Sequence, residues 1–136
     1  MFADVAIAVH PDDSRYSQLV GKFVRHPLCP DRKLPIIADE NVQMDKGTGA
    51  LKITPSHDAL DWEIASRHQE EISSHDQTAL TRSCIDIHGK LNQTANEFAG
   101  IDRFDARAKV IEKLDSCGLF QGTLKHDGQI NLCSRT

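Results

Sequence analysis

The sequence has no excess of positive charge. Its 136 residues include 16 lysines and arginines against 20 aspartates and glutamates, which gives a net charge of -4. Proteins dedicated to binding polyanions are usually basic. The composition therefore argues against a DNA-binding protein, although it allows local basic patches. Two such patches are Lys22, Arg25 and His26, and Arg103, Arg107 and Lys109.

Closely spaced cysteines and long apolar runs are also absent. Cys29, Cys84, Cys117 and Cys133 stand far apart without a C-x-x-C pair. This spacing excludes a disulfide framework and a zinc site built on cysteine pairs, and it suits a reducing compartment. No apolar run approaches the length of a membrane span, and the first residues lack the pattern of a signal peptide. We therefore predict no membrane partner.

The short motifs of many enzyme families are missing too. The chain has no P-loop, no G-x-G-x-x-G and no H-E-x-x-H. Its seven histidines are scattered, and no two stand at the spacing of metal ligands on a helix, so we predict no metal site. No serine or cysteine lies in a nucleophile-elbow context. If the protein is a hydrolase, water is the expected nucleophile.

A single domain with one core fits the length and the 39% of hydrophobic residues. Apolar runs and alternation predict strands at 5–9, 23–24, 34–37, 50–54 and 85–87, and helical spacing predicts helices at 58–68 and 103–117. We also expect a helix start at 11–13, a polar loop at 69–82 and a closing hairpin at 124–133. The expected buried side chains of the two helices are Leu60, Trp62 and Ile64, and Phe104, Ala108, Ile111 and Leu114.

The segment 47–63 carries the most information about chemistry. A Gly-Thr-Gly turn leads into a short strand, on which alternation turns Lys52 and Thr54 to the same face. Asp58 and Asp61 follow at helical spacing and would share a helix face. An ammonium, a hydroxyl and two carboxylates can therefore meet where the strand hands over to the helix, which indicates a polar pocket.

A purely structural interpretation of these residues is also open. Asp58 is a good helix N-cap, and Asp61 suits the positive end of a helix. His57 can hydrogen-bond the turn. Lys52 favours the functional interpretation, because a lysine between two apolar residues on a short strand has fewer structural explanations.

The segment 47–63 resembles the editing-domain signature of valyl-tRNA synthetases, which runs G-T-G-A-hydrophobic-K-hydrophobic-T-P-A-H-D-x-x-D-aromatic-E. Ser56 replaces the usual alanine and Trp62 the usual tyrosine. The similarity extends over almost the whole chain, including 6–13, 34–39, 67–68, 103–107, 118–120 and 133–135. The chain departs from the family at Lys46, where an aromatic residue is usual, and over 69–85, which looks like a lengthened loop.

The resemblance implies a mixed α/β fold with a β-barrel core and surrounding helices. It implies that 1–136 is a single editing-domain fragment of a larger synthetase without the aminoacylation site. Its reaction would be hydrolysis of the ester of threonyl-tRNA(Val), with threonyl-adenylate as a further substrate. Editing would need no cofactor, whereas ATP and magnesium would serve only the aminoacylation site. The parent enzyme would be cytoplasmic or mitochondrial and the domain monomeric.

The resemblance also implies roles for individual residues. Lys52 and Asp61 would meet the threonine hydroxyl, and Asp58 the substrate's α-ammonium. Thr54 would support the pocket or position water. From the residues themselves, and not from the resemblance, we infer that exposed backbone amides of Gly47, Thr48 and Gly49 could stabilise the oxyanion. Arg25 and Lys46 are the candidates for contact with the single-stranded tRNA end.

Two other interpretations remain open at this point. One is a non-catalytic module that binds an RNA end or another partner on the same fold, which the loss of the two matching acids would have favoured. The other is a metal-dependent hydrolase, which would need a cluster of histidines and aspartates. In the family, a Thr-rich segment ending in Arg-Pro-Glu-Thr precedes the position of Met1 and lines the pocket. We therefore expect this chain alone to bind threonyl analogues weakly.

Overall fold

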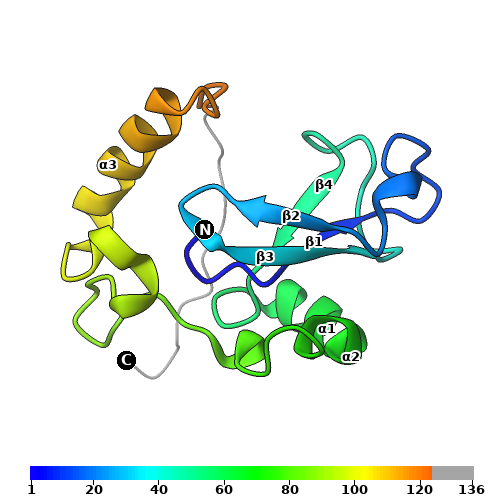
Figure 1. Cartoon of the computed structure of the whole chain (residues 1–136), viewed down its shortest axis with the longest axis horizontal. Coiled ribbons are helices and arrows are strands. Elements are labelled where there is room, and N and C mark those ends of the chain that lie inside the picture. Colours follow the sequence, from blue (N-terminus) through cyan, green and yellow to red (C-terminus); the bar gives the residue numbers. More distant parts are fainter. Residues whose placement is uncertain (124–136) are drawn as a thin grey trace, which may run out of the picture.

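Four strands form the centre of the structure, a computed structural model that describes residues 1–123. They are β1 (Ala6–Val9), β2 (Phe23–His26), β3 (Cys29–Ala38) and β4 (Ala50–Ile53). Their order in the sheet is β2-β3-β1-β4, with β1 parallel to β3 and antiparallel to β4 (Figure 1). The hairpin expected further along the chain lies outside the described residues.

The mixed α/β class predicted from the sequence is confirmed, but the β-barrel is not found in the described part of the chain. β2 and β4 are the outer strands at opposite ends of the sheet, and they do not pair with each other. The sheet is therefore open. The alternation that predicts each strand carries no information on closure, because closure depends on which edges meet.

Residues 1–123 contain three α-helices: α1 (Ala59–Arg67), α2 (Gln69–Ser73) and α3 (Arg103–Ser116). α1 and α2 lie together on one side of the sheet, while α3 stands apart at the far end (Figure 1). Short 3-10 helices occupy Ser17–Leu19 (η1), Ala79–Thr81 (η2) and Gln93–Phe98 (η3). None of the helices in the described residues is long and apolar enough to span a membrane.

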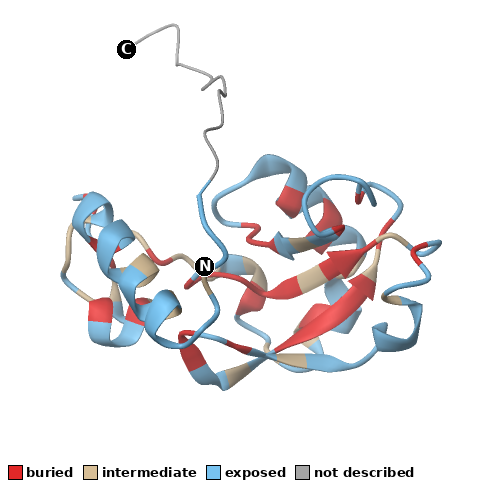
Figure 2. Ribbon diagram, turned by 90° about the horizontal axis from the view of Figure 1, so that it is seen from above, coloured by how far each residue is buried: buried red, intermediate tan, exposed pale blue. Residues whose placement is uncertain are grey.

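The main core lies between the sheet and α1 with α2. Ile37 and Ile53 from the strands meet Ile64 and Ile72 from the helices, and all four are fully buried. Figure 2 shows the buried residues gathered on the strands and on the helix sides that face them. The loop predicted at 69–82 is wrong, because Ile72 on α2 and Ala79 on η2 are buried here. Ile72 and Ala79 are seven positions apart with only polar residues between them, so the segment shows no apolar repeat of helical spacing in the sequence.

The predicted burial along α1 is correct only for Ile64. Leu60 is 47% exposed and Trp62 is 50% exposed. Asp61 takes the inward position with Ile64 and Ala65. These three positions follow the helical repeat. A pattern of hydrophobic residues could not identify this inward side, because one of its members is a carboxylate.

A second cluster joins the start of the chain to the segment around α3. Phe2 and Phe98 pack with their ring centroids 5.2 Å apart. The inward side of α3 consists of Ala106, with Val110 and Leu114 packed against the same cluster. The predicted inward side is therefore wrong for Phe104, which is 70% exposed, and for Ala108, which is exposed. Ile111 and Leu114 are half-buried, and Leu114 packs against the cluster.

The predictions for the short segments 11–13 and 85–87 are tested as well. Residues 11–13 form turns instead of a helix start, and Asp13 is buried at 4% exposure. Near 85–87 the predicted turn is found, and the Gly89 N–H donates to the Asp86 carbonyl over 3.1 Å, but the predicted strand is wrong, because Ile85 and Leu91 form only an isolated bridge.

Candidate active site

An ion pair joins β4 to α1 at the junction between the strand and the helix. Lys52 Nζ lies 2.6 Å from Asp61 Oδ2. The aspartate side chain is 4% exposed and the lysine side chain 48%. The buried carboxylate therefore fixes the end of a lysine that still reaches solvent. The structure brings these two predicted site residues together.

Two further hydrogen bonds fix this carboxylate and the strand end. The Thr54 N–H donates to Asp61 Oδ2 over 2.8 Å, so the same oxygen receives a backbone and a side-chain donor. The Thr54 hydroxyl donates to Asp4 Oδ1 over 2.8 Å. Both Thr54 and Asp4 are buried. Thr54 therefore supports the strand end. Asp4 was missed in the sequence, because 50 residues separate the partners and no local pattern connects them.

Asp58 is the N-cap of α1, as the structural interpretation predicts. Its backbone is extended (φ -147°, ψ 131°), and its Oδ1 accepts from the N–H groups of Leu60 and Asp61 over 2.9 and 3.1 Å. In the described part of the chain, the other carboxylate oxygen has no hydrogen-bond partner. Asp58 is exposed. Capping therefore uses one oxygen and leaves the second free for a ligand.

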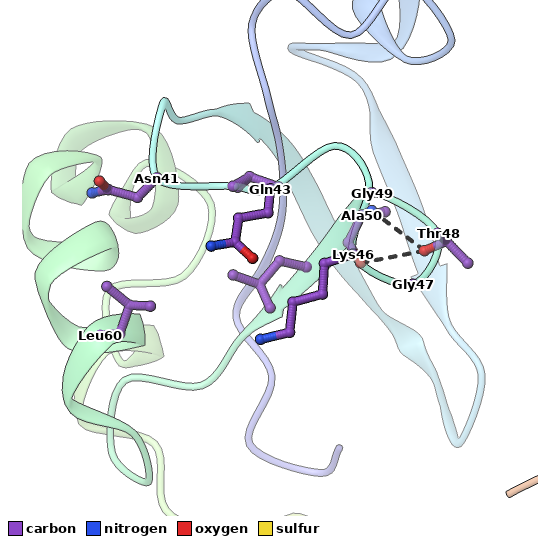
Figure 3. Close-up of a pocket in the computed structure, with 10 residues that line it drawn as sticks. Asn41, Gln43, Lys46, Gly47, Thr48, Gly49, Ala50 and Leu60 are labelled. Atoms are coloured by element: carbon purple, nitrogen blue, oxygen red, sulfur yellow. Dashed lines mark hydrogen bonds between the residues drawn. The ribbon is translucent and has the colours of Figure 1, made fainter. Parts of the chain in front are cut away.

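The Gly-Thr-Gly turn lines a neighbouring pocket of about 400 Å³. Lys46, Gln43 and Leu60 contribute side chains to its wall (Figure 3). Lys52 and Asp61 are not among the lining residues. The complete lining is Asn41, Val42, Gln43, Lys46, Gly47, Thr48, Gly49, Ala50, Leu51 and Leu60.

The backbone amides of this turn are only partly available. The Gly49 N–H donates to the Lys46 carbonyl over 3.1 Å. The Ala50 N–H donates to the Thr48 hydroxyl over 3.3 Å. Within residues 1–123, the N–H groups of Gly47 and Thr48 have no partner. The expectation that all three amides of the turn could stabilise an oxyanion is therefore narrowed to two.

Three residues, Asp13, Arg15 and Tyr16, hold this turn through hydrogen bonds, and we call them the bracket. Arg15 donates from Nε and Nη2 to the two oxygens of Asp13 over 2.9 and 2.6 Å. The same Nη2 donates to the Met44 carbonyl over 2.8 Å. The Tyr16 hydroxyl donates to the Thr48 carbonyl over 2.8 Å. The bracket therefore holds the loop that lines the pocket at two points, the carbonyl groups of Met44 and Thr48.

His57 immediately precedes Asp58, the N-cap of α1. Burial lowers the pKa of His57, and the N-terminal ammonium and Lys52 lower it further. The neutral imidazole accepts at Nε2 from the Cys84 N–H over 3.3 Å. This contact ties the helix start to the second cluster, so the position of His57 agrees with a structural role.

The predicted site residues thus fall into three places. Lys52, Thr54, Asp58 and Asp61 meet at the strand-to-helix junction. Lys46 and the glycine turn line the adjoining pocket, whereas Arg25 lies on β2 at the far edge of the sheet. Among residues 1–123 no three His, Cys, Asp or Glu side chains are grouped to hold a metal ion.

Comparison with known proteins identifies related sequences. A family model described as "Leucyl-tRNA synthetase, editing domain" matches residues 11–115. The chain is 46% identical over 137 residues to the valine–tRNA ligase of Schizosaccharomyces pombe and 44% identical over 136 residues to that of Homo sapiens. It is 45% identical over 138 residues to the mitochondrial valine–tRNA ligase of Saccharomyces cerevisiae. These similarities confirm the resemblance found in the sequence.

Each of these three alignments covers 100% of this chain. The chain spans only a small part of the relatives, 13%, 12% and 10% of their lengths in the same order. The family model itself covers more than half of the chain. The chain therefore belongs to the family of aminoacyl-tRNA synthetase editing domains that this model describes.

Proposed function

We propose that the chain is the editing domain of a valine–tRNA ligase and hydrolyses the ester bond of threonyl-tRNA(Val), with threonyl-adenylate as a further substrate. The single observation that carries the proposal is the Lys52–Asp61 pair, with 2.6 Å between Nζ and Oδ2, in a chain of this family. Family membership supplies the reaction class, and the ion pair supplies a polar contact that distinguishes threonine from valine.

Selectivity follows from the difference between a hydroxyl and a methyl group. An apolar synthetic site rejects threonine poorly, because the two amino acids have nearly the same shape. In the proposed site, the threonine hydroxyl donates to Asp61 and accepts from Lys52. Valine would displace water from the hydrogen-bonding positions that the ion pair leaves open and would leave those positions unsatisfied, at about 1–3 kcal/mol for each.

The remaining roles follow from which atoms are free. Asp58 uses one oxygen for the cap, and its second oxygen pairs with the substrate's α-ammonium. Water attacks the ester carbonyl, and the free N–H groups of Gly47 and Thr48 stabilise the oxyanion. Expulsion of the ribose oxygen, which takes up a proton, then breaks the ester. Thr54 holds Asp61 in place and does not touch the substrate.

The proposal extends to partners, cofactors and location. The partner is the single-stranded 3′ end of tRNA(Val), held by Lys46 beside the pocket and by Arg25. Editing uses no cofactor, whereas ATP and magnesium belong to aminoacylation by the parent enzyme. The parent enzyme works in the cytoplasm or in mitochondria, and the domain acts as a monomer. One relative is named as mitochondrial.

The direct test is Asp61→Ala. In a full-length ligase that carries this domain, we expect the substitution to abolish threonine release from threonyl-tRNA(Val) while circular dichroism shows that the fold is kept. Asp105→Ala, which removes an exposed carboxylate on α3, is the matched control and should deacylate at the parental rate. Parental activity in Asp61→Ala would disprove the assignment of this residue.

Two further measurements separate this function from its alternatives. EDTA should leave deacylation unchanged, and metal analysis should find no stoichiometric ion. A zinc ion at molar ratio would favour a metal-dependent hydrolase. If neither the parent chain nor Asp61→Ala deacylates but both bind the RNA end equally, the chain is a non-catalytic binding module.

A further inference from the structure

We propose that the exposed side of the β2–β3 hairpin binds the phosphate backbone of the same tRNA, upstream of its terminal nucleotide. This inference rests on the proposed function, because it takes tRNA as the partner. The surface consists of Phe23, Arg25 and Lys33, and it is bordered by the half-buried Arg32, whose Nη1 donates to the Phe2 carbonyl. We call it the hairpin surface.

Two cations on this surface face each other without a counter-ion. Arg25 on β2 is directly opposite Lys33 on β3 in the antiparallel register, so the two side chains leave the sheet on the same face. Both are exposed. In the described part of the chain neither takes part in an ion pair. Like charges directly opposite on neighbouring strands are destabilising, and a bound anion would remove that repulsion.

A hollow of about 390 Å³ adjoins these cations. Phe23, Arg32 and Lys33 form one wall, and His75 and Asp76 after α2 form the other. Asp76 is already neutralised by an ion pair with Arg82. Asp31 is the other acid in the lining, so two cations of the hairpin, Arg32 and Lys33, face one free carboxylate across the hollow. The hollow therefore favours an anion.

An exposed aromatic ring accompanies the charges. Phe23 is 40% exposed and shares the face of Arg25, two positions along β2. The ring of His75 stands edge-on to it, with the centroids 4.4 Å apart and an interplanar angle of 82°. Single-stranded nucleic acids bind where a basic groove carries aromatic rings on which bases stack. An acidic peptide would use the cations but not the ring.

The place of the hairpin surface in the sheet decides which nucleotides it meets. β2 and β4 are separated by three strand spacings, about 14 Å at about 4.8 Å each. A substrate ester bound at Lys52 on β4 would therefore place the terminal adenosine away from Arg25, while preceding nucleotides could reach it. The hairpin surface should affect RNA affinity and leave the hydrolytic step alone.

His26 does not belong to this surface, although the sequence places it beside Arg25. It is 1% exposed, and its Nδ1 accepts from the N–H groups of Leu28 and Cys29 over 3.1 and 3.0 Å. Burial lowers the pKa of His26, which keeps the ring neutral. It fixes the turn of the hairpin and adds no charge to the surface.

The test measures binding of a tRNA acceptor-stem RNA with an unpaired 3′ end by fluorescence anisotropy over a salt series. We expect Arg25→Gln with Lys33→Gln to lower the slope of log K against log salt by about one unit for each lost phosphate contact. One unit of slope means that a variant which binds as well as the parent at 1 M salt binds about tenfold more weakly than the parent at 0.1 M salt. Phe23→Leu should weaken binding about fivefold through lost stacking.

The matched control is Lys90→Gln with Lys109→Gln, which removes the same charge from exposed positions elsewhere. An equal loss of slope in this control would show that only net charge matters and would overturn the proposal. So would an unchanged slope in the hairpin variant, or stronger competition by oligoglutamate than by oligouridylate.

Hydrolysis of a threonyl ester of adenosine keeps the two proposals distinguishable. Lys33→Gln alone should hydrolyse this small substrate at the parental rate, because the substrate lacks the upstream phosphates. If the parent chain hydrolyses no threonyl ester but the hairpin variant still loses salt-dependent RNA binding, the proposed function fails and the hairpin surface stands.

Discussion

The junction of β4 and α1 and the region around α3 use helices in different ways. α1 has nine residues and buries Asp61, Ile64 and Ala65, whereas α3 has 14 residues and buries only Ala106. The shorter helix is therefore held on one whole side by the sheet, and a carboxylate lies within that side. The longer helix rests on the second cluster along a narrow stripe. Helix length is thus no guide to how firmly a site residue is held.

Removal of core volume should give the largest difference between the two regions. Ile64→Ala at the main core is expected to lower the free energy of unfolding by about 2–5 kcal/mol, because a fully buried side chain leaves a cavity. Val110→Ala on α3 removes a partly buried side chain and should cost clearly less. Urea denaturation of both variants measures this. Equal losses would contradict the ranking.

Acid should act more strongly near α1 than near α3. Burial raises the pKa of Asp39, but the Asn41 N–H and the Arg67 guanidinium outweigh it and hold the pKa below its ordinary value of 3.8. The ionised carboxylate therefore stabilises the fold above about pH 3.8, and this contribution is lost as the pH falls through the folded-state pKa.

Asp39→Asn should consequently flatten the loss of stability below about pH 4. The matched variant is Asp86→Asn in the turn before α3. Hydrogen bonds from the Lys90 and His88 backbone lower the pKa of Asp86, but this carboxylate is exposed. Its removal should flatten the curve less. Thermal unfolding between about pH 2 and about pH 6, on both sides of the ordinary aspartate pKa of 3.8, measures the acid dependence of both variants. A steeper acid curve in Asp39→Asn would contradict the sign.

Removal of either helix cap should lower stability by a similar amount, but only one of the two removals should lower activity. Asp58 caps α1, and Asp102 caps α3 by accepting from the Phe104 N–H over 2.9 Å. Replacement of either by alanine should cost about 1 kcal/mol. Only Asp58→Ala should also lower deacylation, because its free oxygen pairs with the substrate. Equal activity in the two variants would reduce Asp58 to a cap.

Tyr16→Phe should give the smallest effect. It removes one hydrogen bond to the Thr48 carbonyl, worth about 0.5–1.5 kcal/mol, and the partly exposed position favours the lower end. The pocket turn should loosen, so KM for threonyl-tRNA(Val) should rise more than kcat falls. A fall in kcat with unchanged KM would mean that the bracket acts on the chemical step.

Four of the five predicted strands are found, whereas 85–87 has only an isolated bridge at Ile85, and the environments of side chains were predicted less well. β1 to β4 follow the expected apolar runs, and the junction residues meet where alternation and helical spacing place them. The inward side of α1 was wrong at Leu60 and Trp62, since a buried Asp61 looks like a surface residue to any hydrophobic pattern. Contacts over long chain separations, such as Asp4 with Thr54 and Tyr16 with Thr48, leave no local signal. The strand order leaves none either.

The position of Gly49 has a consequence for how variants of this domain can arise. Its φ is +77°, and a side-chain carbon there would collide with the Arg15 guanidinium and lie 2.9 Å from the Met44 carbonyl. Any replacement meets both a backbone penalty and a collision. A mutational library aimed at a new amino-acid specificity would therefore recover few folded members from position 49. Gln43 and Leu60, exposed side chains on the wall of the same pocket, are the productive positions to diversify.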